Sequence, residues 1–168
     1  MSENYPYIHS NITKNIWITG WEGSTNPSLL KLNNIKTVIC LNLELKKSEQ
    51  DMKMYEELGI KHYNFIMDDM PHVQIGAYFD KIYEVVMKSI KKGPVLVHCT
   101  MGISRSVTAV ISVILRRTIN KHPNSNTDTI LAYVKKRRPC AQPNSGFYNQ
   151  LKKYEELLKT LETPKTIK

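Results

Sequence analysis

The sequence has few cysteines and no long apolar run. Its 168 residues include three cysteines, an odd number that cannot pair completely, and none of them has metal-ligand spacing. No stretch approaches the ~18 apolar residues of a transmembrane helix. Residues 1–6 lack the basic start and apolar stretch of a signal peptide. These absences argue against a disulfide-stapled secreted fold, a metal module and a membrane span, so we expect a soluble intracellular protein without membrane insertion, cytoplasmic and with access to the nucleus.

The chain also lacks internal repeats and low-complexity segments, and its Pro and Gly residues fall between the expected elements. A length of 168 residues lies in the usual range of a single domain. We therefore expect one domain over residues 1–168, with a core from about 8 to 160. The polar end, 163–168, is expected to be frayed.

Short apolar and β-branched stretches alternate with segments of helical periodicity. The expected strands cover residues 16–19, 35–43, 61–66 and 94–98. Residues 76–91 carry apolar side chains at helical spacing and stop at Gly93-Pro94, which predicts a helix. A second helix, 106–119, is apolar on nearly every side from Val107 to Leu115 and should be buried. The alternation predicts an α/β fold, with a central, mostly parallel sheet flanked by helices.

The nine residues from His98 to Ser106, HCTMGISRS, join the last expected strand to the buried helix. Backbone N–H groups at a helix start are unpaired and carry the positive end of the helix dipole, so a loop there suits a phosphate dianion. The same field favours the thiolate form of Cys99. Gly102 allows a close backbone approach, and Arg105 presents a planar fork that can grip two phosphate oxygens. The pattern predicts a cysteine-dependent phosphatase.

A thiolate alone is not sufficient for this reaction. Hydrolysis of phosphate monoesters needs accelerations that reach ~10²¹ in some cases. Most of this must come from positioning, from stabilisation of charge and from protonation of the leaving group. The chain should therefore supply an acid from another segment.

The motif around Cys99 resembles a known family. His98-Cys99, Gly102 and Arg105-Ser106 are similar to the HCxxGxxRS signature of the protein tyrosine phosphatase superfamily, and Ser104 makes the loop resemble the dual-specificity branch. A later segment resembles the AY…R…PNxGFxxQL pattern of the same enzymes through Ala132-Tyr133-Val134, Arg138, Pro143-Asn144-Ser145-Gly146-Phe147 and Gln150-Leu151. The resemblance covers roughly residues 8 to 160. It implies a dual-specificity protein phosphatase that uses a cysteinyl-phosphate intermediate and no cofactor or metal.

The resemblance also implies roles for individual residues. Cys99 is the nucleophile, Arg105 binds the phosphoryl group, and Ser106 hydrogen-bonds the thiolate and eases its departure. Asp69, in the segment Asp69-Met70-Pro71, is the general acid and base, and the adjacent Asp68 is the alternative. The residues expected to surround the phosphoryl group are Thr100, Met101, Gly102, Ile103, Ser104 and Arg105. His98 and Asn144 are expected to support the loop without touching substrate.

Several of these residues also have simpler interpretations. Asp68 and Asp69 are ordinary residues of a solvated turn before a proline. Asn144, with Ser145, is typical of a helix N-cap. Cys40 is expected to be a small buried hydrophobe, and Cys140 has no assigned role.

The substrate class is less well determined than the chemistry. A net charge of +9 favours encounter with anions without identifying them. The basic runs 135–138 and 152–153 are typical of a solvated helix face, so we expect phosphorylated protein substrates and no nucleic acid. The alternatives are a phosphatase of inositol lipids or RNA 5′ phosphates, and a phosphopeptide-binding module with little turnover. In the family that the motif resembles, lipid-directed members typically carry lysines in this loop, where Thr100, Met101 and Ile103 are uncharged. RNA-directed members resemble HCxxGxNR with a second histidine or threonine, a pattern from which Met101 and Ser104 depart. Binding modules of the family have lost the nucleophile, whereas Cys99 and Arg105 are both present here. The sequence leaves the oligomeric state open.

Overall fold

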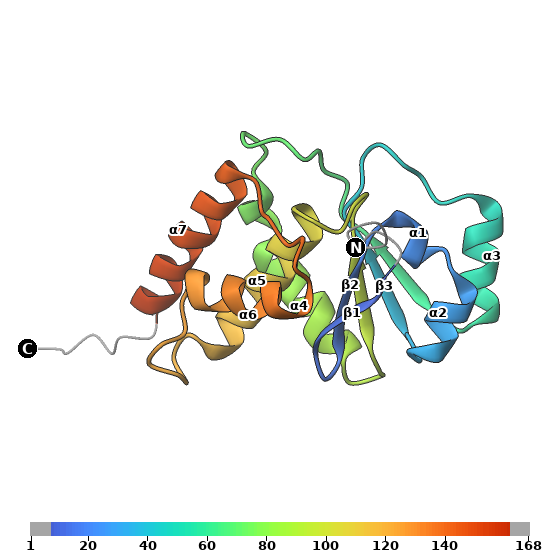
Figure 1. The fold of residues 1–168 in the computed structure, drawn as a ribbon, viewed down its shortest axis with the longest axis horizontal. Coiled ribbons are helices and arrows are strands. Elements are labelled where there is room, and N and C mark those ends of the chain that lie inside the picture. The colour runs from blue at the N-terminus through green and yellow to red at the C-terminus, as the bar shows by residue number, and fades with distance from the viewer. Residues whose placement is uncertain (1–7, 162–168) are drawn as a thin grey trace, which may run out of the picture.

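The computed structural model describes residues 8–161, so the end predicted to be frayed, 163–168, lies outside the described residues. Five strands form one sheet in the order β1-β2-β5-β3-β4 (Figure 1). β1 (Ser10–Thr13) is antiparallel to β2 (Ile16–Thr19). The remaining neighbours, β5 (Val95–His98), β3 (Thr37–Cys40) and β4 (Lys61–Asn64), all pair in parallel. The predicted α/β class with a mostly parallel sheet is confirmed.

Helices cover both faces of this sheet (Figure 1). One face carries α1 (Trp21–Ser24), α2 (Pro27–Leu32) and α3 (Glu49–Glu57), which enclose a smaller apolar cluster around Leu30, Val38 and Tyr55. The other face carries the larger core and four helices: α4 (Phe79–Ser89), α5 (Arg105–Thr118), α6 (Thr127–Arg137) and α7 (Ser145–Leu161). Every residue of α5 from Arg105 to Leu115 is buried, which confirms the prediction of a central buried helix.

The element boundaries differ from the prediction where the chain leaves the sheet. β2 covers the predicted residues, but β3 and β4 end at Cys40 and Asn64, several residues early. Each strand adds one further backbone bond, Leu41 N to His98 O and Phe65 N to Cys40 O, before its chain turns toward the loop after β5. The helix predicted over 76–91 begins as a 3₁₀ turn, η1 (Ile75–Tyr78), and becomes α-helical at Phe79.

The register of the parallel strands brings three strand ends together. Thr19 of β2 and Cys40 of β3 both pair with His98, the last residue of β5. The segments that follow these strands therefore leave the sheet at one edge. In α/β folds, ligands bind at the carboxyl ends of parallel strands. This edge holds the predicted site.

Candidate functional site

The loop between β5 and α5 turns its carbonyl oxygens away from its own interior. Three of these carbonyls accept backbone N–H bonds from other segments of the chain. The pairs are Thr100 O with Trp21 N, Ile103 O with Gln142 N, and Ser104 O with Thr108 N, each at 2.8 Å. Within residues 8–161, the N–H groups of Thr100, Met101 and Ile103 donate no hydrogen bond. The loop therefore keeps backbone donors for an anion at the start of α5.

Arg138 holds the remaining two carbonyls of this loop. Its side chain is fully buried and donates from Nε to Gly102 O (2.6 Å) and from Nη2 to Met101 O (3.2 Å). Gly102 has φ 68°, a left-handed conformation that favours glycine. A Cβ there would lie 2.4 Å from Nη2 of Arg138 and 2.5 Å from Thr19 O. No other residue fits this position without moving the loop.

The sulfur of Cys99 lies inside this loop and is almost fully buried. It accepts a hydrogen bond from Gly102 N at 3.3 Å and lies 3.3 Å from Ser106 Oγ. When the sulfur is a thiolate, the Ser106 hydroxyl is the donor. The predicted nucleophile and the predicted hydroxyl are therefore in direct contact.

Arg105 is buried, and its guanidinium contacts two neighbouring segments. Nη1 donates to Glu44 Oε2 (2.7 Å) and to Met67 O (3.0 Å), and Nη2 donates to Glu44 Oε1 (2.5 Å). These bonds from Arg105 lower the pKa of the Glu44 carboxyl to about 2. Nε makes no hydrogen bond within the described residues and forms an ion pair with Asp69 Oδ2 at 3.5 Å.

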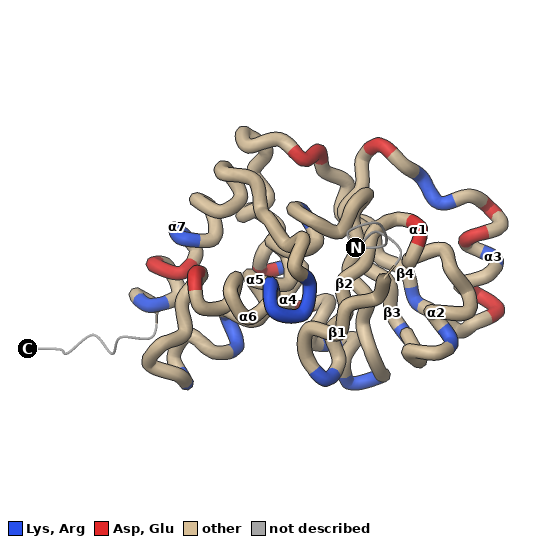
Figure 2. Tube along the Cα trace, in the orientation of Figure 1, with Lys and Arg blue, Asp and Glu red and all other residues tan. Residues whose placement is uncertain are grey.

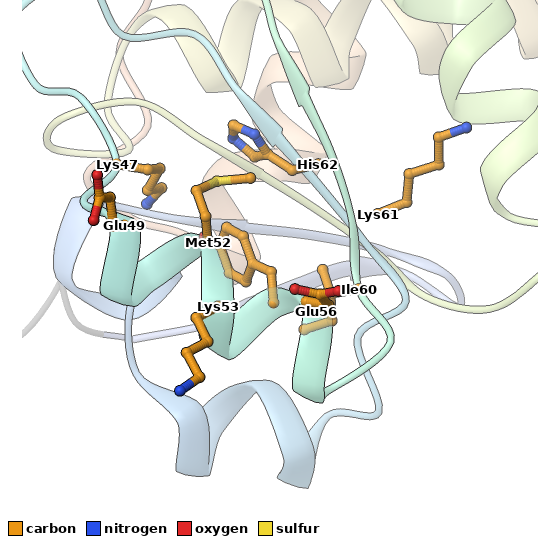
Figure 3. Close-up of a pocket in the computed structure, with 9 residues that line it drawn as sticks. Lys47, Glu49, Met52, Lys53, Glu56, Ile60, Lys61 and His62 are labelled. Atoms are coloured by element: carbon orange, nitrogen blue, oxygen red, sulfur yellow. The ribbon is translucent and has the colours of Figure 1, made fainter.

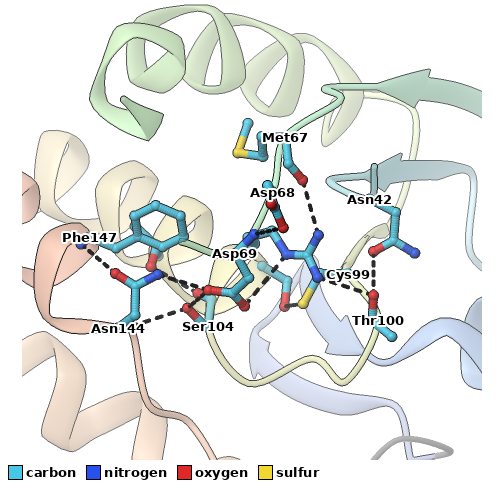
Figure 4. Close-up of polar contacts among 12 residues, drawn as sticks. Asn42, Met67, Asp68, Asp69, Cys99, Thr100, Ser104, Asn144 and Phe147 are labelled. Carbon is cyan, nitrogen blue, oxygen red and sulfur yellow. Dashed lines mark hydrogen bonds and ion pairs between the residues drawn. The ribbon is translucent and has the colours of Figure 1, made fainter. Parts of the chain in front are cut away.

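Asp69 faces the loop, whereas Asp68 is exposed (Figure 4). One carboxylate oxygen of Asp69 accepts bonds from Ser104 Oγ (2.7 Å) and Asn144 Nδ2 (2.8 Å). The other lies 3.5 Å from Nε of Arg105. Asp68 accepts the backbone N–H of Asp69 at 2.8 Å, a contact within the turn. Asp69 is thus fixed by partners from two other segments, which a merely solvated turn would not require.

Two residues at the start of α7 hold the segment that carries Asp69. Asn144 accepts a bond from Phe147 N (2.9 Å), which caps the helix, and its own N–H donates to Ser104 Oγ (3.1 Å). Gly146 packs so closely that a Cβ there would lie 1.8 Å from Pro71 O. The expected helix cap therefore also joins the Asp69 segment to the loop.

The burial and partners of His98, Cys40 and Cys140 indicate what each of these residues does in the structure. His98 is fully buried, and burial holds its pKa well below the ordinary value, so the ring is neutral. Its Nδ1 lies 3.2 Å from Cys99 O, which makes Nδ1 the protonated nitrogen. Burial raises the pKa of the Cys40 thiol, consistent with the expected small hydrophobe. Cys140 is partly buried and unpaired by any disulfide among residues 8–161.

Asn42 and Glu44 were not predicted from the sequence as site residues, although both contact the loop. The Thr100 hydroxyl lies 3.0 Å from Asn42 Oδ1 and 2.5 Å from Glu44 Oε1. Asn42 lies inside the predicted strand 35–43 and Glu44 directly follows it, so no local pattern marked either residue. In the structure, the segment after Cys40 is irregular, and the side chains of Asn42 and Glu44 reach Thr100.

Charge is not concentrated over the site. Lysines and arginines are spread over the chain and gather at the end of α6 (Figure 2). Lys135, Lys136 and Arg137 are exposed there, whereas Arg138 turns inward to the loop. Lys152 pairs with Asp128 at 2.6 Å. These basic runs therefore have the solvated character expected of them, apart from Arg138.

Comparison with known proteins agrees with the geometry. The family described as "Dual specificity phosphatase, catalytic domain" matches residues 16–157. Human dual specificity protein phosphatase 14 is 30% identical over 161 residues, 94% of this chain and 74% of the relative. The rat dual specificity protein phosphatase 18 is 32% identical over 147 residues, 87% of this chain and 66% of the relative. A probable dual specificity protein phosphatase of Dictyostelium discoideum is 41% identical over 107 residues, 64% of this chain but only 25% of the relative.

Solved structures agree as well. The Yvh1 phosphatase domain from Chaetomium thermophilum superposes with a TM-score of 0.76 at 26% identity, over 90% of this chain and 96% of that one. The human tyrosine phosphatase-like serine/threonine/tyrosine-interacting protein gives a TM-score of 0.74 at 26% identity, over 89% and 96%. The chain therefore belongs to the dual specificity phosphatase family of protein phosphatases, within the cysteine-dependent protein tyrosine phosphatase superfamily.

Proposed function

We propose that the described residues form one catalytic domain that hydrolyses phosphotyrosine, phosphoserine and phosphothreonine in proteins through a cysteinyl-phosphate intermediate. One observation carries this proposal. The buried sulfur of Cys99 lies in a loop whose carbonyls are all bound outward, beside an arginine whose Nε has no hydrogen-bond partner within residues 8–161. Such an arrangement is suited to an anion with several oxygens and poorly suited to a neutral ligand.

In the first step, the Cys99 thiolate attacks phosphorus while the bond from phosphorus to the substrate oxygen breaks. The loop amides and Arg105 stabilise the charge on the three non-bridging oxygens. Asp69 enters this step protonated and gives its proton to the departing oxygen. The product is an alcohol or phenol, and the phosphoryl group remains on sulfur.

In the second step, water attacks the phosphoryl group and the sulfur–phosphorus bond breaks. Asp69, now a carboxylate, takes a proton from the water and so returns to its starting form. The departing sulfur leaves as a thiolate, which the hydroxyl of Ser106 stabilises through the contact at 3.3 Å. Inorganic phosphate is released.

The substrates we propose are phosphorylated proteins inside the cell. The net positive charge favours their encounter with the site. Among residues 8–161, helices with the length and apolar character needed to cross a bilayer are absent.

The test is hydrolysis of p-nitrophenyl phosphate in buffer with a chelator, by the wild type and by Cys99→Ser, Asp69→Asn and Asp68→Asn proteins. We expect turnover without added metal, none with Cys99→Ser, and about a hundredfold loss with Asp69→Asn, in the range of general acid catalysis. Asp68→Asn is the matched control and should retain most activity. Turnover that survives Cys99→Ser, or an equal loss from the two aspartate substitutions, would contradict the proposed roles.

A further inference from the structure

The segment 42–45, which contacts Arg105 through Glu44, also lines a cavity outside the catalytic loop. Along residues 42–45, Asn42 and Glu44 turn to the loop and contact Thr100. Leu43 and Leu45 line a cavity of about 460 Å³ next to it, and Asn42 lies between this cavity and Thr100. One short stretch of chain therefore separates the catalytic loop from this cavity.

The opposite wall of the cavity also leads into the catalytic site. Ile66 lines the cavity, and the next residue, Met67, accepts a hydrogen bond from Nη1 of Arg105 through its carbonyl. Asp69 follows two residues later. Both walls thus continue along the chain to residues that contact the guanidinium of Arg105, Glu44 on one side and Met67 on the other.

The cavity combines exposed apolar side chains with polar and basic ones, Asn42, His62, Asn64 and two lysines. Four of its lining side chains belong to the large hydrophobic residues that remain exposed: Ile66 (55%), Leu43 (50%), Met52 (42%) and Leu45 (39%). Exposed apolar side chains gathered in one place are typical of an interaction site. Lys46 and Lys47 also line it, and no Asp or Glu among residues 8–161 does. Lys46 is exposed and forms no ion pair within that range.

A second hollow adjoins the first along α3. It shares Lys47, Met52 and His62 with the cavity and has a volume of about 710 Å³ (Figure 3). In Figure 3, Met52 reaches from α3 toward the ring of His62 on β4. The hollow therefore continues away from the catalytic loop, and its lining there is mostly charged and includes Glu49, Lys53, Glu56 and Lys61.

We propose that this cavity binds the segment of the phosphoprotein substrate that flanks the phosphoresidue, and that it selects an apolar residue with an acidic neighbour. The inference rests on the proposed function and refines its substrate class. The apolar side chain would pack against Leu43, Leu45 and Met52. The acidic neighbour would lie near Lys46, where positive charge has no internal partner.

The experiment compares phosphotyrosine peptides of Ser and Gly in which a Leu-Glu pair is moved one position at a time along both flanks. We expect kcat/KM to rise by roughly tenfold at one position, because burial of a leucine is worth about that factor. Met52→Ser should remove this preference while p-nitrophenyl phosphate turnover stays unchanged. Leu157→Ser, on α7 and 51% exposed, is the matched control and should keep the preference. Lys46→Ala should remove the contribution of the glutamate alone.

Two results would overturn the proposal. The first is a peptide preference that is absent in the wild type or that survives Met52→Ser. The second is loss of binding to phosphatidylserine vesicles in Met52→Ser with unchanged peptide kinetics, which would assign the surface to a membrane. A failure of the proposed function is seen separately, as absent p-nitrophenyl phosphate turnover by the wild type. In that case the same peptides are compared by their affinity for the wild type and for Met52→Ser, with the same expected preference.

Discussion

The side-chain amide of Asn144 donates to the carboxylate of Asp69 at 2.8 Å and ties the proposed acid to the first turn of α7. Because the same carboxylate oxygen also accepts from Ser104, the second oxygen is left toward Arg105 and the loop. The amide thus selects which oxygen is available to substrate. Asn144 is a positioning residue for Asp69, and its side chain also caps α7.

Replacing Asn144 by Ala should therefore lower kcat by about tenfold, the value of one hydrogen bond to a charged group. In an Asp69→Asn background, the same replacement should have little further effect, because the group that it positions no longer transfers a proton. The measurement is kcat for the two single variants and the double variant. Full additivity would show that Asn144 acts by another route.

Gly102 and Gly59 allow a controlled test of the loop conformation. Both have positive φ, 68° and 64°, but a Cβ at Gly59 would meet nothing within 4 Å. Gly59→Ala should cost roughly 1 kcal/mol of unfolding free energy because of the left-handed backbone. Gly102→Ala should cost more, because its Cβ also meets Arg138 and Thr19 O. Only Gly102→Ala should also lower kcat/KM, by about a hundredfold, because it displaces Arg138 and the loop. Urea unfolding and steady-state kinetics of both variants separate the two effects, and an active Gly102→Ala enzyme would refute the loop geometry.

Gly146→Ala should act on acid catalysis without touching the nucleophile. The added Cβ would displace Pro71, and with it the segment that carries Asp69. Poor leaving groups depend on protonation more than good ones do. We therefore expect turnover of phenyl phosphate to fall about tenfold more than that of p-nitrophenyl phosphate.

The control for this substitution is Gly76→Ala. There the nearest atom to the added Cβ is a flexible side-chain oxygen, Gln150 Oε1, at 3.2 Å. This variant should keep the wild-type ratio of the two rates. An equal fall with both substrates in Gly146→Ala would place its effect outside the acid.

The contact between Glu44 and Arg105 predicts a pH dependence of stability. The pKa of Glu44 is about 2 in the folded protein and 4.5 for the free group, so folding favours its ionised form. Its contribution is fully present above pH 4.5 and is lost as the pH falls through about 2. Glu44→Gln should thus be less stable than the wild type at neutral pH, and the difference should close in acid. Urea unfolding across that range measures it, and a gap that does not change with pH would show that the carboxylate charge contributes nothing.

Site residues that lie close together in the sequence could be predicted from it, whereas site residues that are far apart in the sequence could not be predicted from local patterns. Cys99, Arg105 and Ser106 lie in one short motif whose strand and helix flanks are visible as apolar patterns, so the loop could be predicted as a unit. The role of Asp69 could be predicted only from the resemblance to a family, because its contacts with Ser104 and Asn144 span 35 and 75 residues of sequence. A local sequence pattern does not indicate contacts between residues so far apart.

Glu44 could not be predicted from the sequence. Residues 37–41 continue as an apolar strand pattern, and nothing local marks where the chain leaves the sheet. That point is set by tertiary contacts, in which Arg105 and Thr100 draw Glu44 toward the loop. The same turn exposes Leu43 and Leu45, which a continued strand would have placed differently.

The most direct test of the central claim is to quench the protein in acid during turnover of a phosphorylated substrate and to locate phosphorus by mass spectrometry of its peptides. In the wild type, the account predicts a phosphoryl group on the peptide that contains Cys99. Asp69→Asn should increase this phosphorylated fraction if the change slows hydrolysis of the cysteinyl-phosphate more than it slows phosphoryl transfer from substrate. In Cys99→Ser the phosphorylated peptide should be absent. Turnover by the wild type with phosphate found on another residue, or on none under conditions where the second step is limiting, would contradict it.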